Sequence, residues 1–219
     1  MGREIDLLIN YPKSKRNLEE RIKNKTKKQR EVARKFGKEF FDGHRNHGYG
    51  GYKYHSKFWT NVVPSFKAHW NLKKGDSLLD VGCGKGFMIY DFQRIIKGLD
   101  VYGIDISNYA INNSLDKIRN KVCVGNAKNL PFPDKSFDYV ISINSIHNLN
   151  KKECAKALRE IARVSKKGSF ITIDAYKDLH QKKRMFAWNL TAKTIMSDKE
   201  WKKFFKINSY NGDYFWFIP

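Results

Sequence analysis

At 219 residues, the chain has the length of one α/β domain with a small appendage, and it contains no run of about 18 apolar residues that would cross a bilayer. Its 41% hydrophobic and 14% aromatic residues suffice for a substantial core, which excludes an intrinsically disordered chain. The formal net charge of +21 at pH 7 is typical of proteins that bind nucleic acid or another anionic surface. Lysine, however, far outnumbers arginine, the residue that nucleic-acid surfaces prefer, and we therefore favour compositional bias as the source of the charge.

The cysteines and the first residues indicate the compartment. Cys83, Cys123 and Cys154 are scattered, odd in number and without the spacing of a zinc site, which predicts reduced thiols and no bound metal. Residues 1–6 lack the hydrophobic segment of a signal peptide. We therefore expect a cytoplasmic protein with no membrane partner.

Residues 1–60 stand apart from the rest of the chain and predict an N-terminal helical cap. A helix is expected from an N-cap at Asn17 to Phe41, interrupted only by Gly37. Residues 42–54 then combine four glycines with several tyrosines and histidines. A surface loop is the alternative interpretation, but the concentration of aromatic and titratable groups favours an active-site lid, in which we expect His47 and Tyr49 to be catalytic.

A glycine-rich turn at 82–86 organises the second part of the chain. The apolar strand 77–81 carries Asp80 and leads into Gly82-Cys83-Gly84-Lys85-Gly86, which is followed by a helix. The spacing excludes a dinucleotide fingerprint, because the third glycine comes one residue early, and a Walker loop, because Gly86 stands where Ser or Thr is needed. The acidic-x-G-x-G-x-G pattern resembles the first motif of the class I S-adenosylmethionine (SAM) methyltransferases.

Strands and helices alternate after this turn, which predicts a parallel sheet wrapped by helices on both faces. The expected strands are 77–81, 100–105, 122–124, 137–143, 169–174 and 214–218. The expected helices are 58–70, 88–96, 108–118, 151–164, 185–196 and 199–205. The resemblance implies a Rossmann-like, doubly wound, mostly parallel seven-stranded sheet with an antiparallel C-terminal strand, formed by residues 61–219 behind a cap of residues 1–60.

Several later segments match the family in order and indicate a cofactor site. Asp105 ends the second strand at the distance where such folds bind ribose hydroxyls, and a helix cap is the alternative role for this acid. By resemblance, Ile106 packs on the adenine. Asn126 and Ala127, before the Leu-Pro-Phe run at 130–132, match the family segment that binds the adenine amino group, where the Asn126 amide can accept or donate. Asn126 departs from the family, which usually has aspartate there. The expected cofactor-binding residues are thus Asp80, Gly82, Gly84, Gly86, Asp105, Ile106, Asn126, Ala127 and Asn144.

The loop after the fourth strand faces the expected reaction centre, because ligands of open α/β sheets lie at the carboxyl ends of the strands. Asn144 is expected to contact the cofactor and His147 the acceptor, although a lone histidine is more often structural. The resemblance implies SAM-dependent methyl transfer, and we expect a small polar metabolite or a sugar-type hydroxyl or amine as acceptor. Nucleic acid ranks second as a partner. The alternatives are an RNA methyltransferase and a non-catalytic SAM-binding regulatory protein.

Overall fold

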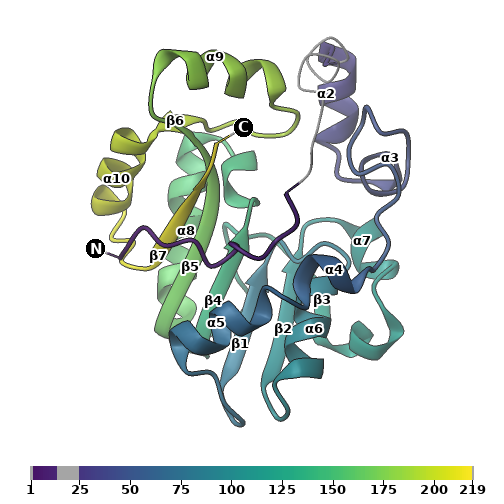
Figure 1. The fold of residues 1–219 in the computed structure, drawn as a ribbon, viewed down its shortest axis with the longest axis vertical. Helices are drawn as coiled ribbons and strands as arrows, with labels where there is room; N and C mark the ends of the chain where they lie inside the picture. The colour runs from purple at the N-terminus through teal and green to yellow at the C-terminus, as the bar shows by residue number, and fades with distance from the viewer. Residues whose placement is uncertain (1, 14–24, 219) are drawn as a thin grey trace.

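A single seven-stranded sheet forms the centre of the computed structural model, which describes residues 2–13 and 25–218. The strand order is β3-β2-β1-β4-β5-β6, with β7 also paired to β5, and each pairing is parallel (Figure 1). The strands are β1 (Ser77–Val81), β2 (Asp100–Asp105), β3 (Val122–Val124), β4 (Phe137–Ile143), β5 (Ser165–Tyr176), β6 (Met196–Ser197) and β7 (Asp213–Phe217). The expected Rossmann-like, parallel α/β fold is confirmed.

Helices cover both faces of this sheet and its carboxyl edge. The α-helices are α2 (Lys27–Ala33), α3 (Lys38–Phe41), α4 (Ser56–Trp59), α5 (Val63–Trp70), α6 (Phe87–Ile95), α7 (Asn108–Asn112), α8 (Lys151–Val164), α9 (Leu179–Trp188) and α10 (Asp198–Ile207). Two 3₁₀ turns, η1 (Asp116–Lys121) and η2 (Ile146–Asn148), complete the connections. In Figure 1, α2, α3 and α9 lie beyond the upper, carboxyl ends of the strands.

Alternating strand residues divide the core into two layers. Leu79, Val140 and Ile171 belong to the apolar cluster that includes α8 and α10. Leu78 and Phe170 instead belong to the cluster that includes α5 and α6. Successive side chains of a strand point to opposite faces, so a nearly continuous apolar strand is required wherever helices cover both faces.

The C-terminal strand runs in the direction opposite to the one expected. β7 pairs in parallel with β5, with Phe170 beside Asp213 and Asp174 beside Phe217. β6 ends at the carboxyl edge, and α10 then returns the chain to the amino edge before β7 begins. A helical crossover of this kind joins parallel strands, whereas an antiparallel strand would need a hairpin. The expected antiparallel C-terminal strand is therefore wrong.

Several expected helices also differ in extent: residues 58–70 hold α4 and α5, and α7 ends at Asn112 instead of Ile118. Within the described residues, the first expected helix is interrupted between α2 and α3, where Phe36 adopts a left-handed φ of 49°. Its expected N-cap, Asn17, lies outside the described residues. The helix expected at 185–196 begins earlier, as α9, because the Asp178 side chain accepts the Gln181 N–H at 2.7 Å and caps it.

The residues before β1 contact the sheet at two places. Glu4 forms a parallel bridge with Tyr214, and the Ile5 N–H donates to the Tyr214 carbonyl at 3.0 Å. Leu7 is buried in the α5–α6 cluster. We therefore keep the name cap for residues 27–54, which hold α2, α3 and the glycine-rich loop, while the domain boundary at residue 60 stays a prediction.

No helix in the described part of the chain combines the length and apolar character that a bilayer span requires.

We expect Trp201→Ala to destabilise the fold strongly. Trp201 is fully buried on α10, and its indole N–H donates to the Asp174 carbonyl at 3.0 Å. Loss of such a side chain costs about 3–5 kcal/mol in the free energy of unfolding. The matched control, Ile207→Ala, removes a side chain of the same helix that is 73% exposed, and should change that free energy by less than about 0.5 kcal/mol. Urea denaturation followed by circular dichroism measures both, and equal losses would contradict the assigned packing.

Candidate active site

The glycine turn between β1 and α6 has a backbone that only glycine tolerates. Gly82 and Gly86 adopt left-handed φ angles of 90° and 76°. A Cβ atom at Gly82 would overlap the Ser145 hydroxyl, and one at Gly86 would overlap the Ile118 side chain. These two glycines are therefore required by the packing of the protein itself, whether or not a ligand is bound.

Asp105 joins the end of β2 to this turn. One of its carboxylate oxygens accepts the Gly84 N–H at 2.8 Å, and the other accepts the Ser107 N–H at 2.8 Å. Burial raises the pKa of Asp105 although both hydrogen bonds act to lower it. Each carboxylate oxygen accepts more than one hydrogen bond, so these contacts leave capacity for the two hydroxyls of a ribose.

Asp80 is a buried acid that lies near Asp105. It is 4% exposed, and its Oδ1 atom has no hydrogen-bond partner among the described residues. Burial and the neighbouring Asp105 charge raise the pKa of Asp80 to about 8. An unpaired buried carboxyl group is costly unless a donor or a cation satisfies it. The two acids therefore fit a ligand that carries hydroxyl groups and positive charge, as SAM does.

The residues expected to contact adenine lie after β2 and β3. Ile106 is 53% exposed, although it follows a buried strand. The Asn126 side-chain oxygen accepts the Lys128 N–H at 3.1 Å, which holds the amide in a turn. The NH₂ group of this amide is then the part that can donate to a ligand. Ala127 packs against the core cluster beside β4. This arrangement leaves an exposed apolar side chain and an amide at neighbouring strand ends.

Asn144 is held at the carboxyl end of β4 by the next strand. Its φ is 49°, its N–H donates to the Thr172 carbonyl at 3.0 Å, and its side-chain oxygen accepts the Thr172 hydroxyl at 3.0 Å. The residue is exposed and follows β4 at the edge of the sheet where the cofactor is expected. Its role in cofactor binding stays a prediction.

His147 lies inside the protein. The side chain is 4% exposed; Nδ1 accepts the Asp174 N–H at 3.1 Å, and Nε2 lies 3.7 Å from the Asp174 Oδ2 atom. Burial lowers the pKa of His147 against the opposing effect of Asp174, so the ring is neutral with its proton on Nε2. These contacts are those of a positioning residue that joins the β4 loop to β5. A catalytic role for His147 stays a prediction.

The cap closes over the middle of the glycine turn. A Cβ atom at Gly84 would lie 3.4 Å from the Tyr52 ring and 3.5 Å from the Phe41 ring. The Tyr52 ring also stacks on Phe87, the first residue of α6, at 4.7 Å and 28°. Burial raises the pKa of Tyr52 well above its ordinary value, and the nearby Asp80 is among the groups that raise it further. Sequence segments 43 residues apart thus form one site.

An ion pair between buried Lys85 and half-buried Asp42 fastens the cap to the turn. The Asp42 Oδ2 atom lies 2.6 Å from the Lys85 Nζ atom and accepts the Tyr109 hydroxyl at 2.7 Å, while Oδ1 accepts the Tyr52 N–H at 2.8 Å. Burial acts to raise the pKa of Asp42, but the hydrogen bonds from Lys85 and Tyr109 lower it overall. The sequence analysis missed Asp42, Lys85 and Tyr109. The sequence did offer one sign of this contact, because the charged residue Lys85 stands between Gly84 and Gly86 of the turn.

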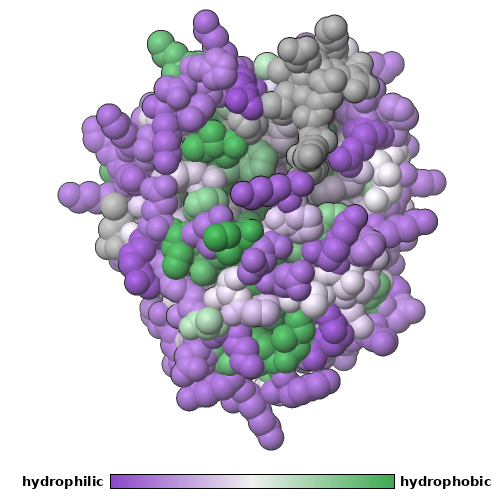
Figure 2. All heavy atoms as spheres, viewed as in Figure 1, coloured by the Kyte–Doolittle hydropathy of each residue, from purple (hydrophilic) through white to green (hydrophobic). Residues whose placement is uncertain are grey.

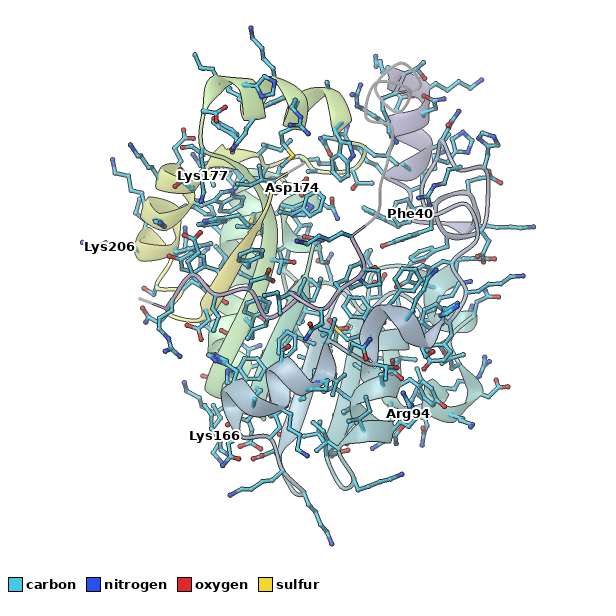
Figure 3. All side chains as sticks on the ribbon, viewed as in Figure 1. Phe40, Arg94, Lys166, Asp174, Lys177 and Lys206 are labelled. Carbon is cyan, nitrogen blue, oxygen red and sulfur yellow. The ribbon has the colours of Figure 1, made fainter. Side chains whose placement is uncertain are left out.

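The two expected catalytic residues of the loop occupy different positions. Tyr49 is 43% exposed, and its ring lies 4.2 Å from Tyr52, which places it next to the turn. His47 is paired within the cap, with Nδ1 3.3 Å from the Glu39 carboxylate. Figure 3 shows Phe40 of the cap and Asp174 of β5 on opposite sides of the upper strand ends. The structure brings Tyr49, but not His47, to the glycine turn, and the catalytic roles of both stay predictions.

Comparisons with known proteins agree with this geometry. Residues 79–173 match the model of the methyltransferase domain family. The ubiquinone/menaquinone biosynthesis C-methyltransferase UbiE of Francisella tularensis subsp. novicida is 34% identical over 110 residues, covering 47% of this chain and 43% of that protein. The UbiE protein of Vibrio cholerae is 36% identical over 110 residues, covering 46% and 41%. The chain thus matches about two fifths of the length of these curated relatives.

Solved structures share the fold over a larger part of the chain. A putative methyltransferase from an antibiotic biosynthesis pathway of Anabaena variabilis is 26% identical, has a TM-score of 0.53, and covers 68% of this chain and 60% of that one. The YcgJ protein of Bacillus subtilis shows the same fold with a TM-score of 0.54 at 21% identity, covering 67% and 66%.

The parallel sheet, the glycine turn and the two acids define a Rossmann-like nucleotide-binding domain of the class I type. Residues 79–173 match the model of the methyltransferase domain family, and the sheet, the glycine turn and the two acids agree with that match. The resemblance inferred from the sequence is confirmed, and SAM is the cofactor of this domain.

The raised pKa of Asp80 makes stability depend on pH. Its ordinary value is 3.8, so between about pH 4 and pH 8 the folded protein retains a proton that the unfolded chain releases. The stabilisation from this proton is complete below the ordinary pKa of 3.8 and is lost as the pH rises to the folded-state pKa of about 8. We therefore expect Asp80→Asn to raise the free energy of unfolding relative to the unchanged protein more at about pH 8 than at about pH 5. Urea denaturation at both pH values tests this.

Asp116→Asn is the control for that experiment, because Asp116 is a 92% exposed carboxylate. The free energy of unfolding of the Asp116→Asn variant should depend on pH as that of the unchanged protein does. An Asp80→Asn profile parallel to that of the unchanged protein would show that Asp80 is ionised in the folded state.

Proposed function

We propose that the protein transfers a methyl group from SAM to a small molecule with a planar, unsaturated ring, beneath the closed cap. The supporting observation is the glycine turn held by Asp105, with the Phe41 and Tyr52 rings directly over Gly84. A cofactor site and a partly exposed aromatic surface therefore meet at one edge of the sheet.

The described residues fit SAM in a consistent way. Asp105 would bind the ribose hydroxyls, Ile106 would pack on the adenine, and the partnerless Asp80 oxygen would accept from the ammonium group of the methionine portion. Bound SAM supplies a methyl group on a sulfonium, whose C–S bond breaks as the methyl carbon bonds to the acceptor and the acceptor loses a proton. The protein's own contribution is alignment and the exclusion of water.

The cap supports a ring-shaped acceptor. Phe40, Phe41, Tyr49 and Tyr52 form a contiguous set of rings, with neighbouring centroids 4.2 to 5.9 Å apart. Aromatic surfaces of this kind bind flat apolar groups by stacking. The relatives named above are C-methyltransferases of quinone biosynthesis, which points in the same direction. The polar, sugar-type acceptor expected from the sequence has no comparable support from these side chains.

The direct test is an acceptor screen that measures S-adenosylhomocysteine release. We expect turnover with a naphthalenediol and much less with an amino sugar or a structured RNA. Asp105→Ala should weaken SAM binding at least about tenfold, because it removes a ligand acceptor and releases the Gly84 N–H. Asp116→Ala, which changes an exposed acid, should bind SAM normally. Preference for the amino sugar or the RNA would reverse the acceptor proposal, and SAM binding without turnover on any acceptor would favour a regulatory protein.

A second experiment tests the closure of the cap. Asp42→Asn leaves Lys85 buried without its counter-ion, so we expect SAM affinity to fall about tenfold and backbone hydrogen exchange in the cap to accelerate. Calorimetry and hydrogen exchange measure the two effects. Glu39→Gln, which changes a half-exposed acid of α3, the helix that Asp42 follows, is the matched control and should alter neither.

The ion pair itself can be isolated with Lys85→Met. If Asp42 acts through Lys85, the double variant should be no worse than Asp42→Asn alone. Additive losses in the double variant would show that the two residues act independently and that their contact does not hold the cap.

A further inference from the structure

The outer face of α9 combines large apolar side chains with lysines. Leu179, Lys182, Lys183 and Phe186 are spaced three, four and seven residues apart, which places them on one side of the helix. Leu179 is 75% exposed and Phe186 is 52% exposed, and both lysines are exposed. Met185 is fully buried and fixes the opposite side of α9 to the protein. Two large apolar side chains in water on one helix face are not explained by the core.

Helix α9 lies at the outside of the molecule, beyond the carboxyl ends of the strands. Figure 1 shows α9 above the strand ends, and Figure 2 shows hydrophobic atoms projecting among hydrophilic ones where α9 lies. The segment after α9 is bound to the cap, because Arg30 Nε donates to the Asn189 carbonyl at 3.1 Å and Arg34 Nη2 donates to the Ala192 carbonyl at 3.2 Å. The helix and the cap thus form one continuous edge.

The charge around α9 favours an anionic partner. Lys27 and Lys28 are exposed at the start of α2, which this edge includes, and Lys177, exposed before the N-cap of α9, lies 3.7 Å from the Glu4 carboxylate. The nearest acids in the sequence are Asp178, which caps α9, and Glu31 on α2. The whole chain carries a formal charge of +21, so an anionic surface is attracted to the protein. The exposed lysines place part of this charge on the edge formed by α9 and the cap.

We propose that the outer face of α9, formed by Leu179, Lys182, Lys183 and Phe186, docks the protein on an anionic lipid surface. Lysines beside exposed leucine and phenylalanine are the composition of helices that lie in a membrane interface, where apolar side chains enter the acyl boundary and lysines contact the head groups. Nucleic acid fits this face less well, because apolar side chains interrupt the lysines and none of the four residues of the face is arginine. The docking is peripheral and replaces the sequence-based expectation of no membrane partner.

The position of α9 connects docking with access to the site. β5 leads directly into α9, and its residue Asp174 contacts His147 in the loop after β4. A lipid surface against α9 would therefore lie at the same end of the molecule as the glycine turn. An apolar acceptor dissolved in the bilayer would then reach the site without crossing water. The docking itself does not depend on methyl transfer and is measured separately from it.

Flotation of the full chain with vesicles tests the proposal. We expect binding to phosphatidylglycerol-containing vesicles, weak binding to pure phosphatidylcholine, and a decline as salt rises from about 50 to 300 mM. Leu179→Glu and Phe186→Glu should each lower the affinity at least about tenfold, and Lys182→Gln with Lys183→Gln should lower it as well. All these side chains are exposed, so the variants should keep the circular dichroism spectrum of the folded protein.

Ile207→Glu is the matched control. Ile207 is 73% exposed on α10, so the change adds the same charge at an equally exposed apolar position outside the proposed face, and should leave vesicle binding within about twofold. The proposal is overturned if the unchanged protein does not bind anionic vesicles, or if both α9 glutamate variants bind like the Ile207 control. It is also overturned if a short RNA binds at physiological salt while vesicles do not, which would assign the lysines to nucleic acid.

Discussion

The hydrogen bond from the Gly84 N–H to the Asp105 carboxylate is the constraint on which the site depends. It fixes the middle of the glycine turn to the end of β2, while the Gly82 N–H donates to the Ile104 carbonyl at 2.7 Å beside it. Lys85 follows Gly84 in this turn and projects toward the cap, where it pairs with Asp42. The conformation of one turn therefore determines the cofactor site, the position of the cap and the contact between them.

The charges of the site are opposite to those of the molecule. The chain has a formal net charge of +21, yet the partly or fully buried groups around the turn are the acids Asp80 and Asp105, and the one lysine of the turn is neutralised by Asp42. Burial raises the pKa of both acids, and the Asp105 charge raises the pKa of Asp80 further, which means that the site gains from a bound positive charge. A cationic ligand such as SAM relieves this repulsion, whereas an anionic nucleotide would increase it.

The sequence predicted what depends on local pattern and missed what depends on distant contacts. The strand at 137–143 and the helix at 151–164 were recovered with their boundaries, because apolar periodicity and capping residues lie within the segments themselves. The direction of β7 was wrong, since it depends on the crossover through α10. Asp42 was missed because its partners lie 43 and 67 residues away. The burial of His147 was equally invisible, because β5 supplies its partner.

The cap is attached at two points of different character, which suggests how it moves. Asp91 is fully buried on α6 and accepts the Tyr54 hydroxyl at 2.7 Å and the Thr60 hydroxyl at 3.1 Å. The Asp42 side chain is instead 23% exposed, so water can replace its contacts at a smaller cost. We therefore expect the attachment at Asp91 to be the fixed end of the cap and the Asp42–Lys85 contact to be the one that opens. Because Lys85 belongs to the glycine turn, any ligand that orders this turn also favours closure of the cap.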